Sequence, residues 1–412
     1  MDIGALGLYM CLFIALYFEV FLLISFIEHA PSKKEDALPR HYPSVSILVP
    51  CFNEEKTLAH TVESLLALQY PQDKLQIVVI DDGSRDATQA IGRDYAHRYP
   101  ESILFLQKKN GGKYTALNLG IEHSHGEIVG CLDADSFAAK DALIEAVKRF
   151  ESDENIMAIT PVMQVYKPRT ALERMQSVEY TFGIFYKKMF DNLSAINVLP
   201  GPFSLYKREV FKQIGPFRHA HNAEDMEIAF RMHSHGLRIV NAHTSFVYTT
   251  VPNTLRTLLR QRIRWSQGFL RNARDYKHMF FNPRFGNFGM LILPFALTGF
   301  FAGTYTALYA AYHLLSLVSS RVTDTTATGI PPHLPDPAAL NWFYINTDMM
   351  LFIVLVVLCL TVVSIILGSR IAQTRLPLKS FVAYFALFGF IAPLWLLRSL
   401  WGALLARESA WR

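Results

Sequence analysis

Four stretches of the chain are apolar over roughly the 20 residues that a helix needs to cross a membrane. They cover residues 3–27, 288–318, 349–367 and 381–397. The first stretch is too long for the core of a signal peptide and lacks a small-residue cleavage site, which favours a retained helix. The last stretch is followed by Arg398 and has Trp395 and Trp401 near its end. It therefore fits either a spanning helix or a helix that lies in the membrane interface.

The charges beside these stretches predict the side of the membrane that each segment occupies. Basic residues follow the first and the third stretch, namely Lys33, Lys34, Arg40, Arg370, Arg375 and Lys379. The segment 320–345 has Arg321 as its one basic residue. Because Lys and Arg accumulate on the cytoplasmic side, residues 31–287 are expected in the cytoplasm and residues 320–345 outside. The sequence thus predicts a protein of the cytoplasmic membrane with a large cytoplasmic domain.

Between the first two stretches, β-rich apolar runs alternate with helical patterns. The apolar runs cover residues 45–50, 75–82, 103–107 and 127–135, and the helical patterns cover 56–68, 86–98 and 113–123. Strands that alternate with helices form a parallel sheet with crossover connections, and ligands bind at the carboxyl ends of its strands. We therefore expect an α/β domain with a mostly parallel sheet, embedded among transmembrane helices.

Residues 254–282, just before the second membrane stretch, alternate basic and apolar side chains. This pattern is typical of an amphipathic helix at the membrane surface. The predicted organisation is a transmembrane helix at 1–30, a cytoplasmic domain at 31–253, amphipathic interface helices at 254–285 and further transmembrane helices at 286–412.

Composition agrees with a membrane protein and excludes some partners. Aromatic residues make up 13% of the 412 residues. The formal net charge is only +5, from 40 basic and 35 acidic residues, so bulk charge does not indicate nucleic-acid binding. The four cysteines lack the spacing of a zinc site or a disulfide framework, which favours reduced thiols.

Polar residues follow three of the predicted strands and should meet at one edge of the sheet. Asp133 and Asp135 come at the end of an apolar run, where two carboxylates can share a hard cation such as Mg²⁺ or Mn²⁺. Taken alone, two carboxylates in this spacing are more often a solvated acidic turn. With Asp81 and Asp82 in the same cleft, however, four carboxylates would repel one another unless a cation intervened.

Six motifs in order resemble those of the membrane-integrated family 2 glycosyltransferases, which include cellulose, chitin, hyaluronan and poly-N-acetylglucosamine synthases. The motifs are VSILVPCFNEE, VVIDDGS, NGGKYTALNLG, GCLDADS, AED and QRIRW, within residues 43–275. The resemblance implies a GT-A-type domain that binds a nucleotide sugar, a divalent metal ion, and inversion at the anomeric carbon. For many members it also implies passage of the growing polymer through the membrane helices.

The resemblance assigns the donor site to five residues and leaves one choice open. Phe52 and Glu54 would flank the uracil and ribose of a UDP-sugar, and Lys113 would steady the nucleotide and the acidic cluster. Asp81 and Asp82 match a pair in which one carboxylate hydrogen-bonds the uracil edge, with no decision between the two. The stretch before Lys113 does not satisfy the phosphate-loop pattern G-x-x-x-x-G-K-[ST].

The same resemblance assigns the metal ligands and the catalytic base. Asp133 would contact the ribose or the diphosphate beside the metal, and Asp135 would bind the metal directly. Asp225 would take the proton of the acceptor hydroxyl, with Glu224 as a positioning neighbour on the acceptor side. The alternative is an ordinary acidic first turn of a helix over 224–234, which the helix dipole favours.

QRIRW has two interpretations, as a membrane anchor and as part of the active site. In the family, Gln261, Arg264 and Trp265 would cover the mouth of the site. Arg264 would hydrogen-bond the diphosphate, and Trp265 would stack beneath the acceptor sugar. Arg262 is expected on a different side of the same helix, where it should tolerate lysine.

The motifs define the acceptor side less closely. Phe203 and Ser204, in the loop GPFSLY, would line the acceptor site, although a plain turn explains the Gly and the Pro of this loop as well. Ala223 stands where the family has Thr, so a hydroxyl group is missing beside the expected base.

The expected activity is transfer of a sugar from a UDP-sugar to the hydroxyl of a growing polysaccharide or oligosaccharide. Expected partners are the donor, a carbohydrate acceptor that a lipid can carry, and membrane lipids, with no nucleic acid; the sequence identifies no export partner. Two alternatives stay open. One is transfer of a single sugar to a polyprenyl-phosphate lipid, and the other is a membrane subunit that binds nucleotide sugars without turnover.

Overall fold

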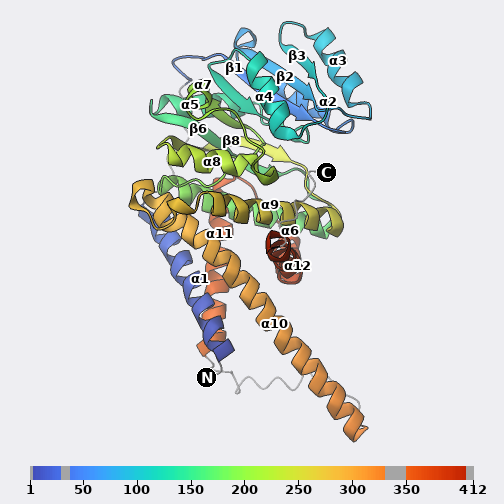
Figure 1. Ribbon diagram of the computed structural model, residues 1–412, viewed down its shortest axis with the longest axis vertical. Coiled ribbons are helices and arrows are strands. Elements are labelled where there is room, and N and C mark those ends of the chain that lie inside the picture. Colours follow the sequence, from blue (N-terminus) through green and yellow to red (C-terminus); the bar gives the residue numbers. More distant parts are fainter. Residues whose placement is uncertain (1–2, 29–37, 330–348, 405–412) are drawn as a thin grey trace.

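The computed structural model describes residues 3–28, 38–329 and 349–404 of the chain. An eight-stranded sheet lies at one end of the molecule, and long apolar helices extend away from it (Figure 1). The strands are β1 (Val45–Cys51), β2 (Leu75–Asp81), β3 (Ile103–Gln107), β4 (Ile128–Cys131), β5 (Ser136–Ala138), β6 (Ile156–Val165), β7 (Ser204–Lys207) and β8 (Arg238–Thr249). Their order in the sheet is β3-β2-β1-β4-β7-β6-β8-β5.

The first four strands pair in parallel, as predicted. The other half of the sheet is mixed, because β7 runs antiparallel to β4 and β6, and β5 runs antiparallel to β8. The fourth predicted strand is shorter than expected: β4 ends at Cys131, and the chain crosses to the far edge of the sheet to form β5. Asp133 and Asp135 therefore lie on this connection and not within a strand.

Helices cover both faces of the sheet. They are α2 (Leu58–Leu66), α3 (Thr88–Arg98), α4 (Lys113–His123), α5 (Ala142–Glu151), α7 (Arg208–Ile214) and α8 (Glu224–Ser234). Neighbouring β1 side chains point to opposite faces, so that Ile47 packs with residues of α2 and α5, and Leu48 with residues of α4, α7 and α8. Both are fully buried, which explains why β1 is a continuous apolar run without a polar face.

Among the described residues, four helices are long and apolar enough to cross a membrane, at the positions that the sequence predicted. The helices α1 (Ile3–Glu28), α10 (Leu293–Thr328) and α11 (Met349–Ile371) run away from the α/β domain, whereas α12 (Leu378–Leu404) is seen nearly end-on and runs across them (Figure 1). This direction favours the interfacial interpretation of α12. The prediction of a loop at 320–345 is wrong for residues 320–328, because these residues continue α10. Residues 330–345 lie outside the described residues.

Two amphipathic helices, α6 (Ala171–Asn192) and α9 (Leu255–Asp275), lie between the sheet and the apolar helices (Figure 1). The helix predicted within 254–282 is confirmed; it begins after Thr254, whose side chain accepts a hydrogen bond from the N–H of Thr257 at 3.3 Å. The apolar side of α9 is covered by other helices. Leu258 is buried against α6 and Trp395 of α12.

Candidate active site

A cavity of about 160 Å³ lies at the carboxyl ends of β1 and β4, beside the first turn of α8 and one side of α9. Ten of the residues proposed from the sequence line it: Phe52, Glu54, Lys113, Asp133, Asp135, Glu224, Asp225, Gln261, Arg264 and Trp265. Segments far apart in the sequence thus meet at one edge of the sheet, where the parallel topology predicts a ligand site.

Lys113, the first residue of α4, is the cation at the centre of the acidic cluster. Its Nζ lies 2.5 Å from Oδ1 of Asp133 and 3.7 Å from Oε1 of Glu224. Burial lowers the pKa of Lys113, but attraction to these two carboxylates outweighs burial and raises its pKa above the usual value. Gly201 lies directly against this pair, so that a Cβ at position 201 would displace Lys113 Nζ and Asp133 Oδ1.

The loop before Lys113 is held by Asp82. This carboxylate accepts hydrogen bonds from the N–H groups of Gly111 at 3.1 Å and Gly112 at 2.9 Å, and from Nζ of Lys108 at 2.6 Å. Gly112 has a φ of +91°, a conformation that glycine adopts without strain. Asp82 is fully buried and does not line the cavity, so its contacts position the loop that carries Lys113.

Asp81, at the end of β2, has a different environment. Its Oδ1 accepts the N–H of Ser84 at 3.1 Å, whereas its buried Oδ2 has no hydrogen-bond partner. Like Asp82, it is fully buried and lies outside the cavity lining. Since buried carboxylate oxygens are normally paired, Asp81 is the member of the pair with acceptor capacity to spare.

Asp225 lies on the first turn of α8 and faces the cavity. Its Oδ1 accepts the N–H of Met226 at 2.9 Å. Burial and the negative charge of Glu224 raise its pKa from 3.8 to about 6, and the positive charges of Lys113 and Arg264 limit this rise. A carboxylate with a pKa just below neutrality is ionised at pH 7 and is still basic enough to accept a proton.

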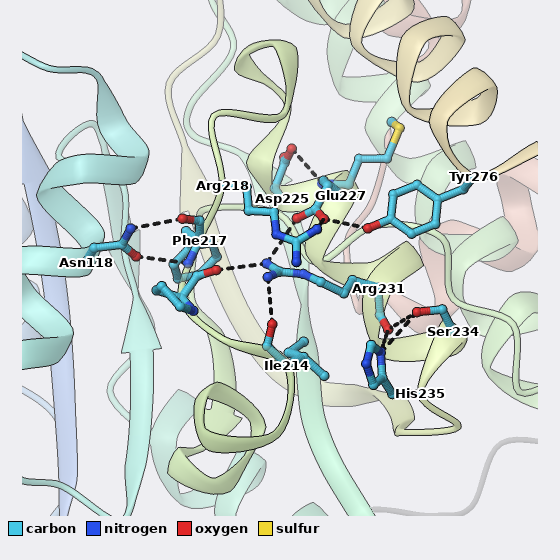
Figure 2. Close-up of polar contacts among 12 residues, drawn as sticks. Asn118, Ile214, Phe217, Arg218, Asp225, Glu227, Arg231, Ser234, His235 and Tyr276 are labelled. Carbon is cyan, nitrogen blue, oxygen red and sulfur yellow. Dashed lines mark hydrogen bonds and ion pairs between the residues drawn. The ribbon is translucent and has the colours of Figure 1, made fainter.

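A polar network behind Asp225 anchors α8 (Figure 2). Glu227 accepts a hydrogen bond from the hydroxyl of Tyr276 at 2.6 Å and forms an ion pair with Arg231 at 3.1 Å. Arg231 also donates to the carbonyl of Ile214 at 2.8 Å. These contacts join α8 to the end of α7 and to the residue after α9, so the carboxylate of Asp225 is carried by a fixed helix.

The turn before Asp225 is strained. Ala220, His221 and Asn222 have φ values of +45°, +57° and +61°, which is uncommon for residues other than glycine. Asn222 lines the cavity, whereas Ala223 packs against α9 so closely that a Cβ on Gly268 would collide with the Cβ of Ala223. The residue that replaces the family's Thr at position 223 therefore contacts α9 and does not form part of the cavity wall.

The side chains of QRIRW divide between two environments. Gln261, Arg264 and Trp265 line the cavity. Arg262 is buried on another side of α9, where its guanidinium lies 2.8 Å from Oε2 of Glu179 and 4.4 Å from the ring centre of Trp265. Arg262 thus lies on a different side of the helix, as predicted, and supports Trp265 from behind. That position 262 tolerates lysine stays a prediction.

Comparison with known families agrees with this geometry. Residues 46–215 match the family described as Glycosyl transferase family 2. This part of the chain is a glycosyl transferase family 2 domain. The match covers β1 to the end of α7, and therefore includes Lys113, Asp133 and Asp135. Asp225 and QRIRW lie beyond the matched residues, at 225 and 261–265, and complete the cavity.

Curated relatives include two synthases from staphylococci. The chain is 31% identical over 244 residues to "Poly-beta-1,6-N-acetyl-D-glucosamine synthase" of Staphylococcus aureus (strain COL), which covers 59% of this chain and 58% of the relative. It is 32% identical over 225 residues to the protein of the same name in Staphylococcus epidermidis (strain ATCC 35984), with 54% of each chain covered. The chain thus spans little more than half the length of these relatives.

A solved structure shares the fold of nearly the whole chain. It is described as "Mannosyltransferase PcManGT from Pyrobaculum calidifontis in complex with GDP-Man and Mn2+". The TM-score is 0.65 at 21% sequence identity, over 98% of this chain and 99% of the other. The predicted GT-A-type architecture is confirmed.

Two predicted acceptor residues of the family 2 domain do not reach the cavity. Phe203 is fully buried in the core, has a φ of +62°, and donates its N–H to the carbonyl of Cys131 at 2.6 Å. Ser204 is also fully buried and donates its hydroxyl to the carbonyl of Pro200 at 2.6 Å. Ser204 begins β7 and pairs with Cys131 at the end of β4, and Phe203 directly precedes it and bonds to the same residue. This attachment to β4 turns both into core residues.

Several cavity residues carried no recognisable signal in the sequence. They are Met163, Tyr180, Asn222, Thr249 and Thr250, from β6, α6, the turn before α8, and the end of β8. Their positions depend on the mixed half of the sheet and on the interface helix α6. Neither hydrophobic periodicity nor a short motif predicts the strand order of the mixed half or the position of α6.

The acidic residues of the cavity suit a hard divalent cation. Asp133 and Asp135 both line the cavity, and Oδ1 of Asp135 accepts a hydrogen bond from Ser136 at 3.2 Å. The described residues contain no group of three or more His, Cys, Asp or Glu that would enclose a metal ion alone. Two carboxylates with the remaining positions left to water and phosphate are the set that Mg²⁺ prefers, so these residues fit such an ion.

Proposed function

We propose that the protein is an inverting glycosyltransferase that uses a nucleotide sugar as donor. The observation that carries this proposal is the placement of Asp225, a carboxylate with a pKa of about 6, in one cavity with Asp133, Asp135 and the cations Lys113 and Arg264. A base, a diphosphate site and an acceptor opening are all that a single displacement at the anomeric carbon requires.

In the proposed reaction, the hydroxyl oxygen of the acceptor attacks the anomeric carbon of the donor sugar. The bond from that carbon to the diphosphate oxygen breaks on the opposite face, and the nucleoside diphosphate leaves with the electron pair. Asp225 accepts the proton of the hydroxyl group. Lys113 and Arg264 offset the negative charge that grows on the leaving diphosphate, an effect that is strong in a site shielded from water.

A divalent ion would be held by Asp135, with Asp133 beside it, and would supply further neutralisation of the diphosphate. Mn²⁺ and GDP-mannose are named for the solved structure from Pyrobaculum calidifontis. For this chain we propose Mg²⁺ or Mn²⁺, supported by its own two carboxylates on the connection after β4.

We propose a UDP-sugar as the donor. Phe52 and Glu54 line the end of the cavity nearest β1 and would flank the nucleoside. The unpaired Oδ2 of Asp81 would accept the imide N–H of uracil if the base enters beside β2. N-acetylglucosamine is the first sugar to test, because the relatives are named for a polymer of it.

We propose further that the acceptor is a growing glycan at the membrane and that the domain faces the cytoplasm. Support for the first point is α9, which lines the cavity with Gln261, Arg264 and Trp265 and packs against α12. Figure 1 shows α9 between the sheet and the apolar helices. Support for the second is the set of basic residues that follow α1 and α11 in the sequence. An enzyme that transfers a single sugar would have the same active-site geometry. The length of the product distinguishes it from a polymer synthase.

The test is a panel of UDP- and GDP-sugars with the purified full chain and Mg²⁺ or Mn²⁺. We expect release of nucleoside diphosphate from a UDP-sugar and a glycan product longer than one unit. The variant Asp225→Asn should bind the donor but lose roughly 10²- to 10⁴-fold in rate. Asp94→Asn, an exposed carboxylate on α3, is the matched control and should keep the wild-type rate.

Three outcomes would contradict the proposal in different ways. No turnover with any donor would make the chain a binding subunit. A product with a single added sugar would refute polymer synthesis. Near-normal turnover by Asp225→Asn would assign the base to another residue.

A further inference from the structure

A second cavity of about 300 Å³ adjoins the active site on the side away from the donor residues. It lies between β6 and the interface helices α6 and α9, and shares Met163, Tyr180 and Trp265 with the first cavity. The donor motifs of the domain do not reach it. These three shared residues, among them Trp265, thus separate the two cavities.

The charges on this second cavity do not balance. Glu179 and Arg262 neutralise each other as an ion pair at 2.8 Å. Lys187 also lines the cavity, and its Nζ donates to the hydroxyl of Thr160 at 3.0 Å. Within the described part of the chain, no carboxylate forms an ion pair with Lys187, whereas the neighbouring Lys188 is paired with Asp191 at 3.3 Å.

An unbalanced ammonium group in such a place is unfavourable without an anion. Burial lowers the pKa of Lys187 to about 8, and the charge of Asp225 opposes this shift. Lys187 therefore remains largely protonated at pH 7. An anion that entered the cavity would find a half-buried ammonium group with unused hydrogen-bonding capacity, beside an arginine that Glu179 already neutralises.

The remaining walls are apolar and face toward the membrane helices. Val162, Ile184, Phe190 and Val198 contribute aliphatic and aromatic surface. Tyr186 forms part of the wall, and its hydroxyl donates to Glu19 of the membrane helix α1 at 2.7 Å. Since α6 also packs against α11 and α12, the apolar part of the cavity lies next to the helices that would contact lipid.

We propose that this cavity binds the phosphate group of a membrane amphiphile at Lys187, with the apolar chain of the amphiphile along α6, and that this amphiphile carries the acceptor. An apolar wall beside one unpaired cation suits an alkyl phosphate better than a neutral glycan or a free anion. The acceptor role rests on the proposed transferase function, whereas the phosphate site does not depend on it.

The test measures binding and turnover separately on the purified full chain in a neutral detergent. Dodecyl phosphate, dodecanol and inorganic phosphate are titrated by calorimetry. We expect dodecyl phosphate to bind and the other two to bind at least 10-fold more weakly. Lys187→Gln should weaken dodecyl phosphate binding roughly 10-fold or more, since a hydrogen bond to a charged group is lost. Lys187→Arg should retain binding.

The matched control is Lys277→Gln, which removes one positive charge from an exposed residue just after α9. It should leave the affinity unchanged. If Lys187→Gln does not fold, Val198→Trp, which fills the apolar part of the cavity, provides the second test and should also block dodecyl phosphate.

Equal affinity of wild type and Lys187→Gln for dodecyl phosphate would overturn the site. If inorganic phosphate binds as tightly as dodecyl phosphate, the inference that the ligand is an amphiphile is refuted. If dodecyl phosphate binds at Lys187 but no nucleotide sugar is turned over, the phosphate site stands and the transferase function fails. If dodecyl phosphate does not bind, the phosphate site fails whatever the turnover. If it binds at Lys187 and nucleotide-sugar turnover occurs, but bound dodecyl phosphate leaves that turnover unchanged, the acceptor inference alone fails.

Discussion

The ion pair behind Trp265 provides a test that separates stability from turnover. Arg262 on α9 and Glu179 on α6 form this pair at 2.8 Å, and the guanidinium stacks on the Trp265 ring at 4.4 Å. The side chain of Arg262 is only 6% exposed, and that of Glu179 is 24% exposed. The perturbation is Arg262→Met, first alone and then together with Glu179→Met.

The two variants should differ in stability. Arg262→Met alone leaves the half-buried carboxylate of Glu179 without its cation. This is expected to destabilise the fold, but by less than the roughly 3–5 kcal/mol of a fully buried pair, because Glu179 is 24% exposed to water. Burial already raises the pKa of Glu179 and Arg262 counteracts the rise, so this carboxyl should protonate more readily in the single variant. The double variant replaces both charges with apolar side chains of similar length and should be close to wild type in stability.

Turnover should be impaired in both variants. The Arg262–Trp265 stacking is worth about 0.5–2 kcal/mol. If the orientation of Trp265 matters for the transition state, losing this contact lowers kcat by roughly 2- to 30-fold. The double variant is the informative one, because it should fold normally and still turn over slowly.

The assay combines thermal unfolding with kcat and KM for the donor. Arg260→Met, an exposed arginine on the same helix, is the control for the loss of one positive charge. A double variant with wild-type kcat would refute the positioning role of Arg262. A double variant as unstable as the single one would refute the argument from the buried charge.

The other predictions concern the chemistry of the first cavity. Because the pKa of Asp225 is raised to about 6, the base is protonated in acid, and kcat/KM should fall about tenfold per pH unit below about pH 6 and be level above it. A value of kcat/KM that stays level down to about pH 5 would show that another group is the base. Asp135→Ala should weaken donor binding and the response to Mn²⁺ together, as measured by donor titration with and without the ion, and an unchanged response would place the metal elsewhere. Arg264→Lys should insert and fold normally but lose roughly 10-fold or more in kcat, because lysine lacks the planar fork that pairs with a diphosphate. Arg260→Lys should be neutral, and equal small effects at both positions would leave QRIRW a membrane anchor.

Local patterns in the sequence were sufficient for much of the fold and of the site. The four apolar helices follow from the length of each hydrophobic run, and the parallel half of the sheet follows from the alternation of strands and helices. Residues such as Lys113, Asp133 and Asp225 could be proposed together because each follows a strand or begins a helix, and such ends meet at one edge of a parallel sheet.

Only the tertiary structure decided which side chains face the cavity and which support it. Phe203 is only two residues from the cavity-lining Gly201, yet it is buried in the core, where its N–H bonds to Cys131 at the end of β4. Glu179 meets Arg262 across a separation of 83 residues. Within the residues that the structure describes, the packing of α6 against β6 places Lys187 beside the hydroxyl of Thr160 and in no ion pair with a carboxylate. These outcomes depend on how distant segments pack in three dimensions. The hydrophobic periodicity of a sequence predicts helices and strands, but it does not predict which side chains from different elements will be in contact.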